Sequence, residues 1–486
     1  MVVVAVEARK LDLPTLSLSS PQVTSLLYDP NSLSLALMHS DSTFSLYPSF
    51  SPFSLSSSSL PSPQSLVPGP SSCACFVNLN PNPKFPDCPD RSRVVFVTAG
   101  PHSGGSRVVL RFYFLGNDGK FGKAQVVCSQ NGISFDRKSG VIVDVSHGMK
   151  VVLSGSVNYL AMYSGSAGKV WVFGVKMVGN ERDLRLVKCA VIDCNLPVLS
   201  VFISSGFLVL GELHGVRVFP LRALVKGRVG GRRRSRVVKG MIENLKMPNG
   251  AIIPLGESYN LDKNSANLKK STLMANGHAC NVPEGVSSNS NVDRNHDAVK
   301  LRSLKLRQDS GEVGMQFILF DDSVVEGIKS RVPGYKIRKA ISIQALSHQK
   351  FLILDSNGEL HLLHMLRSGC FKMRRLTGII QVQRLAAFPD MSATAQDAWI
   401  SDGLFSLHNL VICDTDTSEN QNDRGCNEEK IIQSSVTGVI FASENIQDII
   451  ALAANSIMIL GRGTIYTCCS SVYSTADLTI IRFLMS

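Results

Sequence analysis

Eight cations near the middle of the chain are the residues with the clearest potential for chemistry. They fall within eighteen residues that hold no carboxylate: Arg222, Lys226, Arg228, Arg232, Arg233, Arg234, Arg236 and Lys239. Clustered cations on a glycine-containing segment can lie extended in an acidic groove or against phosphates. The first interpretation is a nuclear import signal, centred on Arg228 to Lys239, with importin as a partner. Direct contact with RNA or DNA and a solvated basic loop are the alternatives.

Catalytic and metal-binding signatures are incomplete wherever they begin. Gly165 to Lys169 resembles a P-loop but lacks its first glycine and its Ser or Thr, which favours a hairpin turn. The run that starts at Asp414 begins like a calcium loop, yet Glu419 stands where the sharp turn requires glycine. His361 and His364 are three apart in an expected strand, so they project to opposite faces and cannot share a metal locally.

The twelve cysteines do not have the spacing of a zinc site. The pairs Cys73/Cys75 and Cys468/Cys469 both lack the C-x2-C arrangement that lets two thiolates hold one ion. Scattered cysteines in apolar runs are typical of reduced, buried thiols in an intracellular protein. We therefore expect no cofactor, no metal and no enzymatic activity.

Seven short strand-like phrases recur along the chain and must form the framework. They start at Thr43, Val108, Lys169, Gly215, Glu359, Leu404 and Ser456. Uninterrupted neighbours are 46 residues (169 to 215), 45 (359 to 404) and 52 (404 to 456) apart, which is the repeat length of a propeller blade. The sequence predicts an all-β, seven-bladed β-propeller in which Trp171, Phe173, Val218 and Phe219 pack between neighbouring sheets.

Changes in amino-acid composition along the chain divide the expected ring into segments. Residues 1–224 are assigned to blades 1 to 4, with a Ser/Pro-rich loop at 49–72 between the first two blades. Residues 225–312, with one aromatic residue, are expected to be a disordered basic and polar insertion. Blades 5 to 7 follow at 313–467, with a polar surface loop at 414–430. Residues 468–486 form a C-terminal tail, either an added edge strand or unpacked.

Two further segments have two interpretations each. The N-terminal strand Val2 to Val6 either completes the last blade and closes the ring, or belongs to the first blade. The basic run Lys300 to Arg307 alternates charge with leucine, so it is either an edge strand or a second half of the import signal.

On these phrases the chain resembles a degenerate member of the WD40/YVTN-repeat-like β-propeller superfamily, over roughly residues 1 to 467. The Trp-Asp pair that ends the third strand of a typical WD40 blade is missing, because Trp171 is followed by Val172 and Trp399 by Ile400. The resemblance therefore implies the fold and no subfamily.

Composition narrows the function classes. With 44% hydrophobic residues and a mean hydropathy of +0.11, the chain can bury a large core. The apolar run Ile449 to Leu460 is too short to span a bilayer, and the first residues lack the order of a signal peptide. We expect a nuclear protein, with a cytoplasmic address as the alternative and no membrane contact. Its function is expected to be a scaffold that binds other proteins through the propeller rims, or else a nucleic-acid-associated factor in RNA processing or DNA repair.

Overall fold

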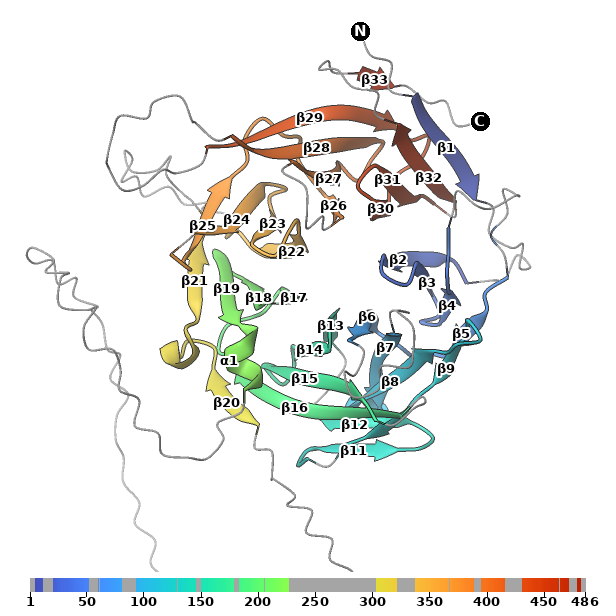
Figure 1. Ribbon diagram of the computed structural model, residues 1–486, viewed down its shortest axis with the longest axis vertical. Helices are drawn as coiled ribbons and strands as arrows, with labels where there is room; N and C mark the ends of the chain where they lie inside the picture. The colour runs from blue at the N-terminus through green and yellow to red at the C-terminus, as the bar shows by residue number, and fades with distance from the viewer. Residues whose placement is uncertain are drawn as a thin grey trace, which may run out of the picture. The chain divides into compact units, whose positions relative to one another are not determined.

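The computed structural model describes residues 5–11, 21–51, 60, 62–80, 93–128, 130–145, 150–178, 183–204, 206–226, 303–320, 337–366, 368–388, 395–415, 431–462, 464–471 and 479–481. They belong to one contact unit, and the second unit, residues 230–301, falls outside them. Seven antiparallel sheets stand side by side around a centre, which confirms the seven-bladed propeller (Figure 1). The described α-helix is the five-residue α1 (Leu221–Val225).

Each of the first four blades runs from an inner to an outer strand. Blade 1 contains β2 (Val23–Asp29), β3 (Ser34–His39), β4 (Phe44–Tyr47) and β5 (Ser65–Val67). Blade 2 contains β6 (Cys73–Leu79), β7 (Arg93–His102), β8 (Arg107–Leu115) and β12 (Gly140–Asp144). Blade 3 contains β13 (Val151–Ser156), β14 (Tyr159–Ser164), β15 (Lys169–Met177) and β16 (Asp183–Asp193). Blade 4 contains β17 (Ser200–Ile203), β18 (Phe207–Glu212), β19 (Gly215–Pro220) and β21 (Gln316–Leu319).

The last three blades follow the same plan. Blade 5 contains β22 (Ala340–Ala345), β23 (Lys350–Asp355), β24 (Leu360–Met365) and β25 (Phe371–Arg375). Blade 6 contains β26 (Arg384–Ala387), β27 (Ala395–Ser401), β28 (Ser406–Thr415) and β29 (Ile431–Phe441). Blade 7 contains β30 (Asp448–Ala453), β31 (Ser456–Leu460), β32 (Ile465–Ser471) and, as its outer strand, β1 (Ala5–Leu11).

Short additional elements complete the described chain. They are β9 (Phe121–Lys123), β10 (Gln125–Val127), β11 (Ile133–Asp136), β20 (Leu304–Arg307) and β33 (Thr479–Ile481), with two 3-10 turns at Ser103–Gly105 and Gly311–Val313.

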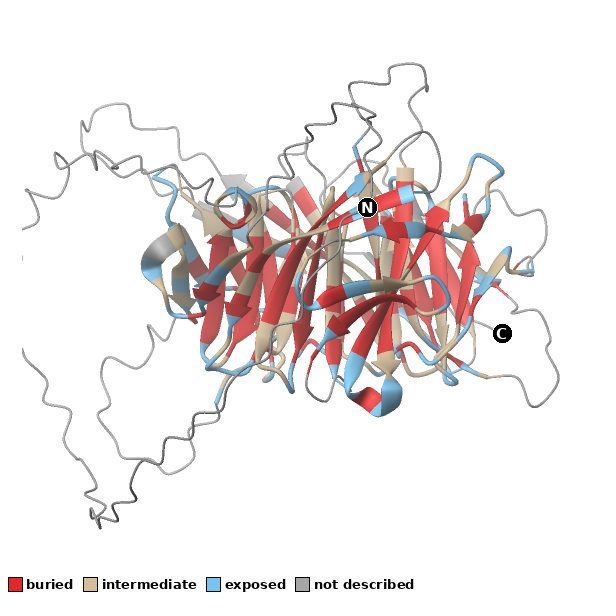
Figure 2. Ribbon diagram, turned by 90° about the horizontal axis from the view of Figure 1, so that it is seen from below, coloured by how far each residue is buried: buried red, intermediate tan, exposed pale blue. Residues whose placement is uncertain are grey.

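Seven apolar clusters fill the seven spaces between neighbouring blades. On β15, Trp171 and Phe173 pack towards blade 2, whereas Val170 and Val172 pack towards blade 4. Successive side chains of a strand point to opposite faces, and both faces are covered here, so a continuous apolar run is required. Val218 and Phe219 likewise face different neighbours, which confirms the predicted packing. Buried residues fill the thickness of the ring, and exposed ones lie mainly at its rims (Figure 2).

The N-terminal strand closes the ring, as the first interpretation expected. β1 pairs antiparallel with β32, from Ala5 opposite Ser471 to Leu11 opposite Ile465. Pairing the two ends of the chain removes the unpaired edge that an open ring would leave in blade 7. Residues 1–4 lie outside the described part.

Six of the seven phrases form the third strand of their blade, and the phrase at Ser456 does not. The phrase at Ser456 is β31, the second strand of blade 7, and the third strand is β32. The tail prediction is therefore also wrong at its start, because β32 continues through 468–471. Farther on, β33 pairs parallel with β29 of blade 6, which agrees with an added edge strand.

The long segments interrupt blades and do not separate them. The expected loop at 49–72 lies inside blade 1 and not between blades, and it is wrong at Ser65–Val67, because these residues form β5, which pairs with β4. The insertion lies inside blade 4, because the outer strand of that blade, β21, follows the insertion and pairs with β19. The prediction that blade 5 starts at 313 is therefore wrong. The insertion also ends before 312, because β20 pairs parallel with β16 of blade 3. Of the two interpretations of the basic run Lys300 to Arg307, this pairing supports the edge strand. Of the expected disordered insertion 225–312, residues 227–302 lie outside the described residues, and so do residues 416–430 of the loop expected at 414–430.

Candidate functional site

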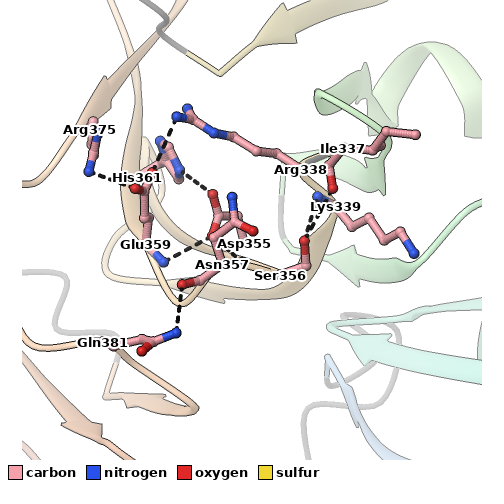
Figure 3. A network of polar contacts seen from close by, with 10 residues as sticks. All are labelled: Ile337, Arg338, Lys339, Asp355, Ser356, Asn357, Glu359, His361, Arg375 and Gln381. Carbon is pink, nitrogen blue, oxygen red and sulfur yellow. Dashed lines mark hydrogen bonds and ion pairs between the residues drawn. The ribbon is translucent and has the colours of Figure 1, made fainter. Parts of the chain in front are cut away.

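A network of polar side chains lies at the turn between β23 and β24 of blade 5 (Figure 3). Asp355 ends β23, Glu359 precedes β24, and His361 is the second residue of β24. One ligand atom from each of these three residues lies within 4.8 Å of the others. Asp355 and His361 are fully buried, so the group needs internal partners.

The Asp355 carboxylate organises the turn. Its Oδ1 accepts hydrogen bonds from the backbone N–H of Asn357 (2.8 Å) and of Glu359 (2.9 Å), and its Oδ2 lies 3.2 Å from His361 Nε2. Burial alone would raise the pKa of Asp355, but the bonds from His361 and from the two backbone donors lower it below the ordinary 3.8. The carboxylate is therefore held ionised as an acceptor.

Gly358 lets this turn approach the segment that leads into blade 6. Its φ of +81° is a conformation that favours glycine, and a Cβ there would lie 2.5 Å from Gln381 Cγ. The backbone N–H of Val382 donates to Gly358 O (2.9 Å), and Gln381 Nε2 donates to Asn357 O (3.2 Å). The turn is thus fixed to the entry of blade 6.

Two arginines hold the Glu359 carboxylate. Arg375 Nη2 of β25 lies 2.6 Å from Oε1, and Arg338 Nη2 lies 3.6 Å from Oε2. Arg338 also connects to blade 4, because its carbonyl accepts a hydrogen bond from the His214 N–H (2.8 Å). The turn is in this way joined to the blade on its other side.

Further contacts reach the turn from the blade 4 side. The Phe320 ring lies against the His361 ring, with 4.3 Å between the centroids. The Ser356 N–H donates to Lys339 O (2.9 Å), and the Lys339 N–H donates to Ser356 Oγ (3.2 Å). These contacts make the turn of blade 5 a clasp, a term used here for Asp355, Glu359, His361 and the residues bonded to them.

The donor set fits a structural clasp better than a metal centre. Both Asp355 oxygens are engaged, and Glu359 faces two guanidinium groups. A divalent ion would have to displace Arg338 and Arg375 from the Glu359 carboxylate, and their positive charges would repel it. An ionised Asp355 fixed by three donors is equally unsuited to take up a proton as a general base.

Related pairs occupy the corresponding turns of the neighbouring blades. In blade 4, Arg217 Nε and Nη2 donate to buried Glu212 at 2.7 and 3.0 Å. In blade 6, Asp402 and His408 have the same six-residue separation as Asp355 and His361. That repeated spacing is a signal in the sequence from which the clasp could have been found, and the sequence reasoning missed it.

The residues expected to form the functional cluster lie elsewhere. Arg228, Arg232, Arg233, Arg234, Arg236 and Lys239 all fall in 227–302, outside the described residues, so the structure does not test their role. Of the eight-cation run, Arg222 on α1 and Lys226 just after it are described, and both are exposed. Gly165 to Gly168 form the turn between β14 and β15, as expected.

Comparisons with known proteins find no matching protein family and no matching curated protein. Among solved structures, the chain is similar to the β-propeller domain of Cps50 (Swd1) from Myceliophteria thermophila, with 9% identity, a TM-score of 0.43 and coverage of 94% of this chain and 99% of that one. It is also similar to the WD40 repeats of RRP9 (7%, TM-score 0.39, 96% and 97% covered) and to U3-55K (7%, TM-score 0.40, 95% and 98% covered). The fold is the seven-bladed β-propeller described above, and at such identities and TM-scores these structures say nothing of what this chain does.

Proposed function

We propose that this protein is a non-enzymatic scaffold that holds partner proteins on the rims of its ring, within a nuclear complex. The observation that carries the proposal is where the long connections leave the sheets. The interruptions of blades 1, 4 and 6 all fall between a third and an outer strand: β4 and β5, β19 and β21, and β28 and β29.

This placement puts these three connections on one side, whereas the connection between β21 and β22, residues 320–339, starts at the other rim. Because strands within a blade alternate in direction, every connection from a third to an outer strand starts at the same rim. In blade 7 the third strand β32 ends and the outer strand β1 begins at this same rim, because Ala5 lies opposite Ser471. Loops gathered on one rim of a closed ring can vary for binding while the sheets stay intact.

The polar groups of the opposite rim support a non-enzymatic role. The turn between β23 and β24 joins second and third strands, so it lies at the other rim. Its carboxylates are committed to the clasp, where they stabilise neighbouring blades. This supports a rigid platform more than a reaction centre.

An affinity purification from nuclear extract tests the scaffold. The full-length chain serves as bait, with and without nuclease treatment of the extract. We expect the same protein partners to be recovered in both samples. Loss of every partner after nuclease would contradict the scaffold and favour the nucleic-acid function.

Nuclear import is proposed to depend on the cations between Arg228 and Lys239. Replacing Arg232, Arg233, Arg234 and Arg236 with Ala in a fluorescent fusion should lower nuclear accumulation through loss of importin binding. The free energy of unfolding should change by less than about 0.5 kcal/mol, as for exposed charges. The matched control replaces Lys263, Lys269 and Lys270 of the same insertion. A quadruple variant that is as nuclear as the parent would contradict the import role and favour a cytoplasmic address.

The second candidate function is a nucleic-acid-associated factor in RNA processing or DNA repair. The formal net charge of +12 and the eight-cation run support it, because cations that neutralise phosphates give binding that weakens steeply with salt. Binding of RNA and duplex DNA is measured across a salt series. A steep slope that flattens in the quadruple arginine variant would place this function ahead of the scaffold, and the absence of binding would remove it.

A further inference from the structure

Several outer edges of the ring are covered by extended segments of the same chain. In blade 2, β11 pairs with the outer strand β12. In blade 3, β10 and β20 both pair parallel with β16, and in blade 6, β33 pairs parallel with β29 (Figure 1). The outer edge of a blade in this molecule therefore accepts an added strand.

The outer strand of blade 5, β25, has no such cover among the described strands. Two backbone bonds fix which of its groups point outward: Leu376 N–H to Leu360 O (2.9 Å) and Leu366 N–H to Cys370 O (2.8 Å). In an antiparallel pair the bonded residues alternate, so Lys372 and Arg374 bond to β24. The backbone groups of Phe371, Met373 and Arg375 consequently face outward.

A side chain of blade 4 already uses one end of this edge as a strand would. The Phe371 N–H donates to Gln316 Oε1 (3.0 Å), and Gln316 Nε2 donates to Gly369 O (3.1 Å). The amide thus makes the same pair of bonds as the peptide group of an added strand. Beyond it, no described strand pairs with the outward backbone groups of Met373 and Arg375.

Charge determines what kind of strand this edge can accept. Three of the five residues of β25 are cations, and Lys372, Arg374 and Arg375 are all exposed. Lys372 and Arg374 are two apart and share a face, while Arg375 on the other face is held by Glu359. Cations on an edge oppose pairing with ordinary strands, whereas carboxylates at alternate positions of an incoming strand would complement them.

We propose that β25 binds an extended acidic segment of a partner protein as an added strand of blade 5. Backbone groups of Met373 and Arg375 supply the ladder, and Arg374, together with Lys372, selects alternating carboxylates. This inference rests on the proposed scaffold function and names the chemistry of one of its partners.

The test uses a fluorescent peptide in which glutamate alternates with valine, and its binding to the full-length chain is followed by anisotropy. A second peptide has proline in place of the central valine, which keeps the charge and removes one backbone donor. Arg374→Glu is the test variant. Arg185→Glu on β16 is the matched control, because it makes the same charge change on an exposed residue of an edge that β10 and β20 cover.

We expect Arg374→Glu to weaken peptide binding by about fivefold or more, since it replaces an attraction with a repulsion at an exposed site. The proline peptide should bind about tenfold more weakly, and Arg185→Glu should bind like the parent. Equal binding of both peptides, or equal loss in both variants, would overturn the added strand.

Two other results would also overturn the proposal. The parent chain could fail to bind the alternating peptide, or it could bind only after Asp416, Glu419, Asp423, Glu428 and Glu429 are changed to amides, which would assign the edge to this chain's own acidic run. The scaffold itself is judged separately. If partners are recovered after nuclease treatment and still bind the Arg374→Glu variant, the scaffold function is supported and β25 is excluded as their binding site.

Discussion

The turns of blades 5 and 6 start from the same local design and reach different environments. Asp402 accepts from the N–H of Leu404 (2.9 Å) and of Ser406 (3.1 Å), which repeats the two backbone bonds of Asp355 at the same spacing. His408, however, lies against Ser406 Oγ at 3.1 Å and is half-buried, whereas His361 is fully buried on Asp355.

The difference comes from what surrounds each turn. The blade 5 turn packs beneath Phe320 and against Gln381, and its fifth residue, Glu359, engages two arginines. In blade 6 the backbone N–H groups of Ile446 and Ala442 donate to the carbonyls of Leu404 (2.9 Å) and Phe405 (2.8 Å), but Leu404 is 54% and Phe405 48% exposed. The spacing of Asp and His therefore determines the shape of the turn, and the neighbouring blades determine how much stability it contributes.

Asp355→Ala should have the largest effect on this comparison. It leaves two backbone donors and His361 Nε2 without their partner, and His361 Nδ1 has no hydrogen-bond partner among the described residues. We expect a loss of about 3 kcal/mol in the free energy of unfolding, measured by denaturant titration. Asp355→Asn, which keeps one acceptor, should lose less.

Asp402→Ala removes the equivalent two backbone bonds from the more exposed turn of blade 6. Because Leu404 and Phe405 are exposed and no fully buried histidine depends on the carboxylate, we expect a loss of about 1 kcal/mol in the same titration. A cost equal to that of Asp355→Ala would contradict the role assigned to the surrounding blades.

Glu359→Gln separates the arginine contacts from the turn itself. Glu359 is 25% exposed and Arg375 is 40% exposed, so solvent screens the pair, and we expect a loss of about 0.5 to 1 kcal/mol. Unfolding of Arg375→Gln and of the double variant completes a double-mutant cycle. A coupling energy near zero would remove Arg375 from the clasp.

The smallest expected effect is a pH dependence at His408. Burial lowers the pKa of His408 below its ordinary 6.5, and the Asp402 charge opposes this shift only in part. Its unfolded form then binds a proton more readily, so this contribution to stability is present above about pH 6.5 and is lost as the pH falls through the folded pKa. His408→Gln should flatten the dependence of the unfolding temperature between about pH 7.5 and pH 5. If the pH dependence of the unfolding temperature is the same in His408→Gln as in the parent, it arises from other titrating groups.

The fold could be predicted because third strands in this ring are continuous apolar runs covered on both faces. The prediction failed where strands exist through pairing more than through composition. β32 reads Ile-Tyr-Thr-Cys-Cys-Ser-Ser and has a weaker apolar signal than β31, so the recurring phrase was placed on β31, one strand before the third strand of the blade. β5 and β20 have only three and four residues, too few to show a period in the sequence.

The clasp was harder to predict than the ring. The Asp-to-His spacing of the turn is local and visible twice in the sequence. The arginine contacts are not local, since Arg375 reaches Glu359 through the register that places His361 opposite Arg375, and Arg338 comes from the segment before β22. No spacing along the chain specifies that three blades meet at this turn.

A metal titration tests most directly whether Asp355, Glu359 and His361 are a clasp or a binding centre. The unfolding temperature of the parent chain and of Glu359→Gln is measured with a chelator and with excess Zn²⁺, Ca²⁺ or Mg²⁺. The clasp predicts that neither chelator nor metal shifts the parent relative to the variant. A metal-dependent stabilisation of the parent that Glu359→Gln abolishes would show that these residues bind a metal ion, and it would contradict the account.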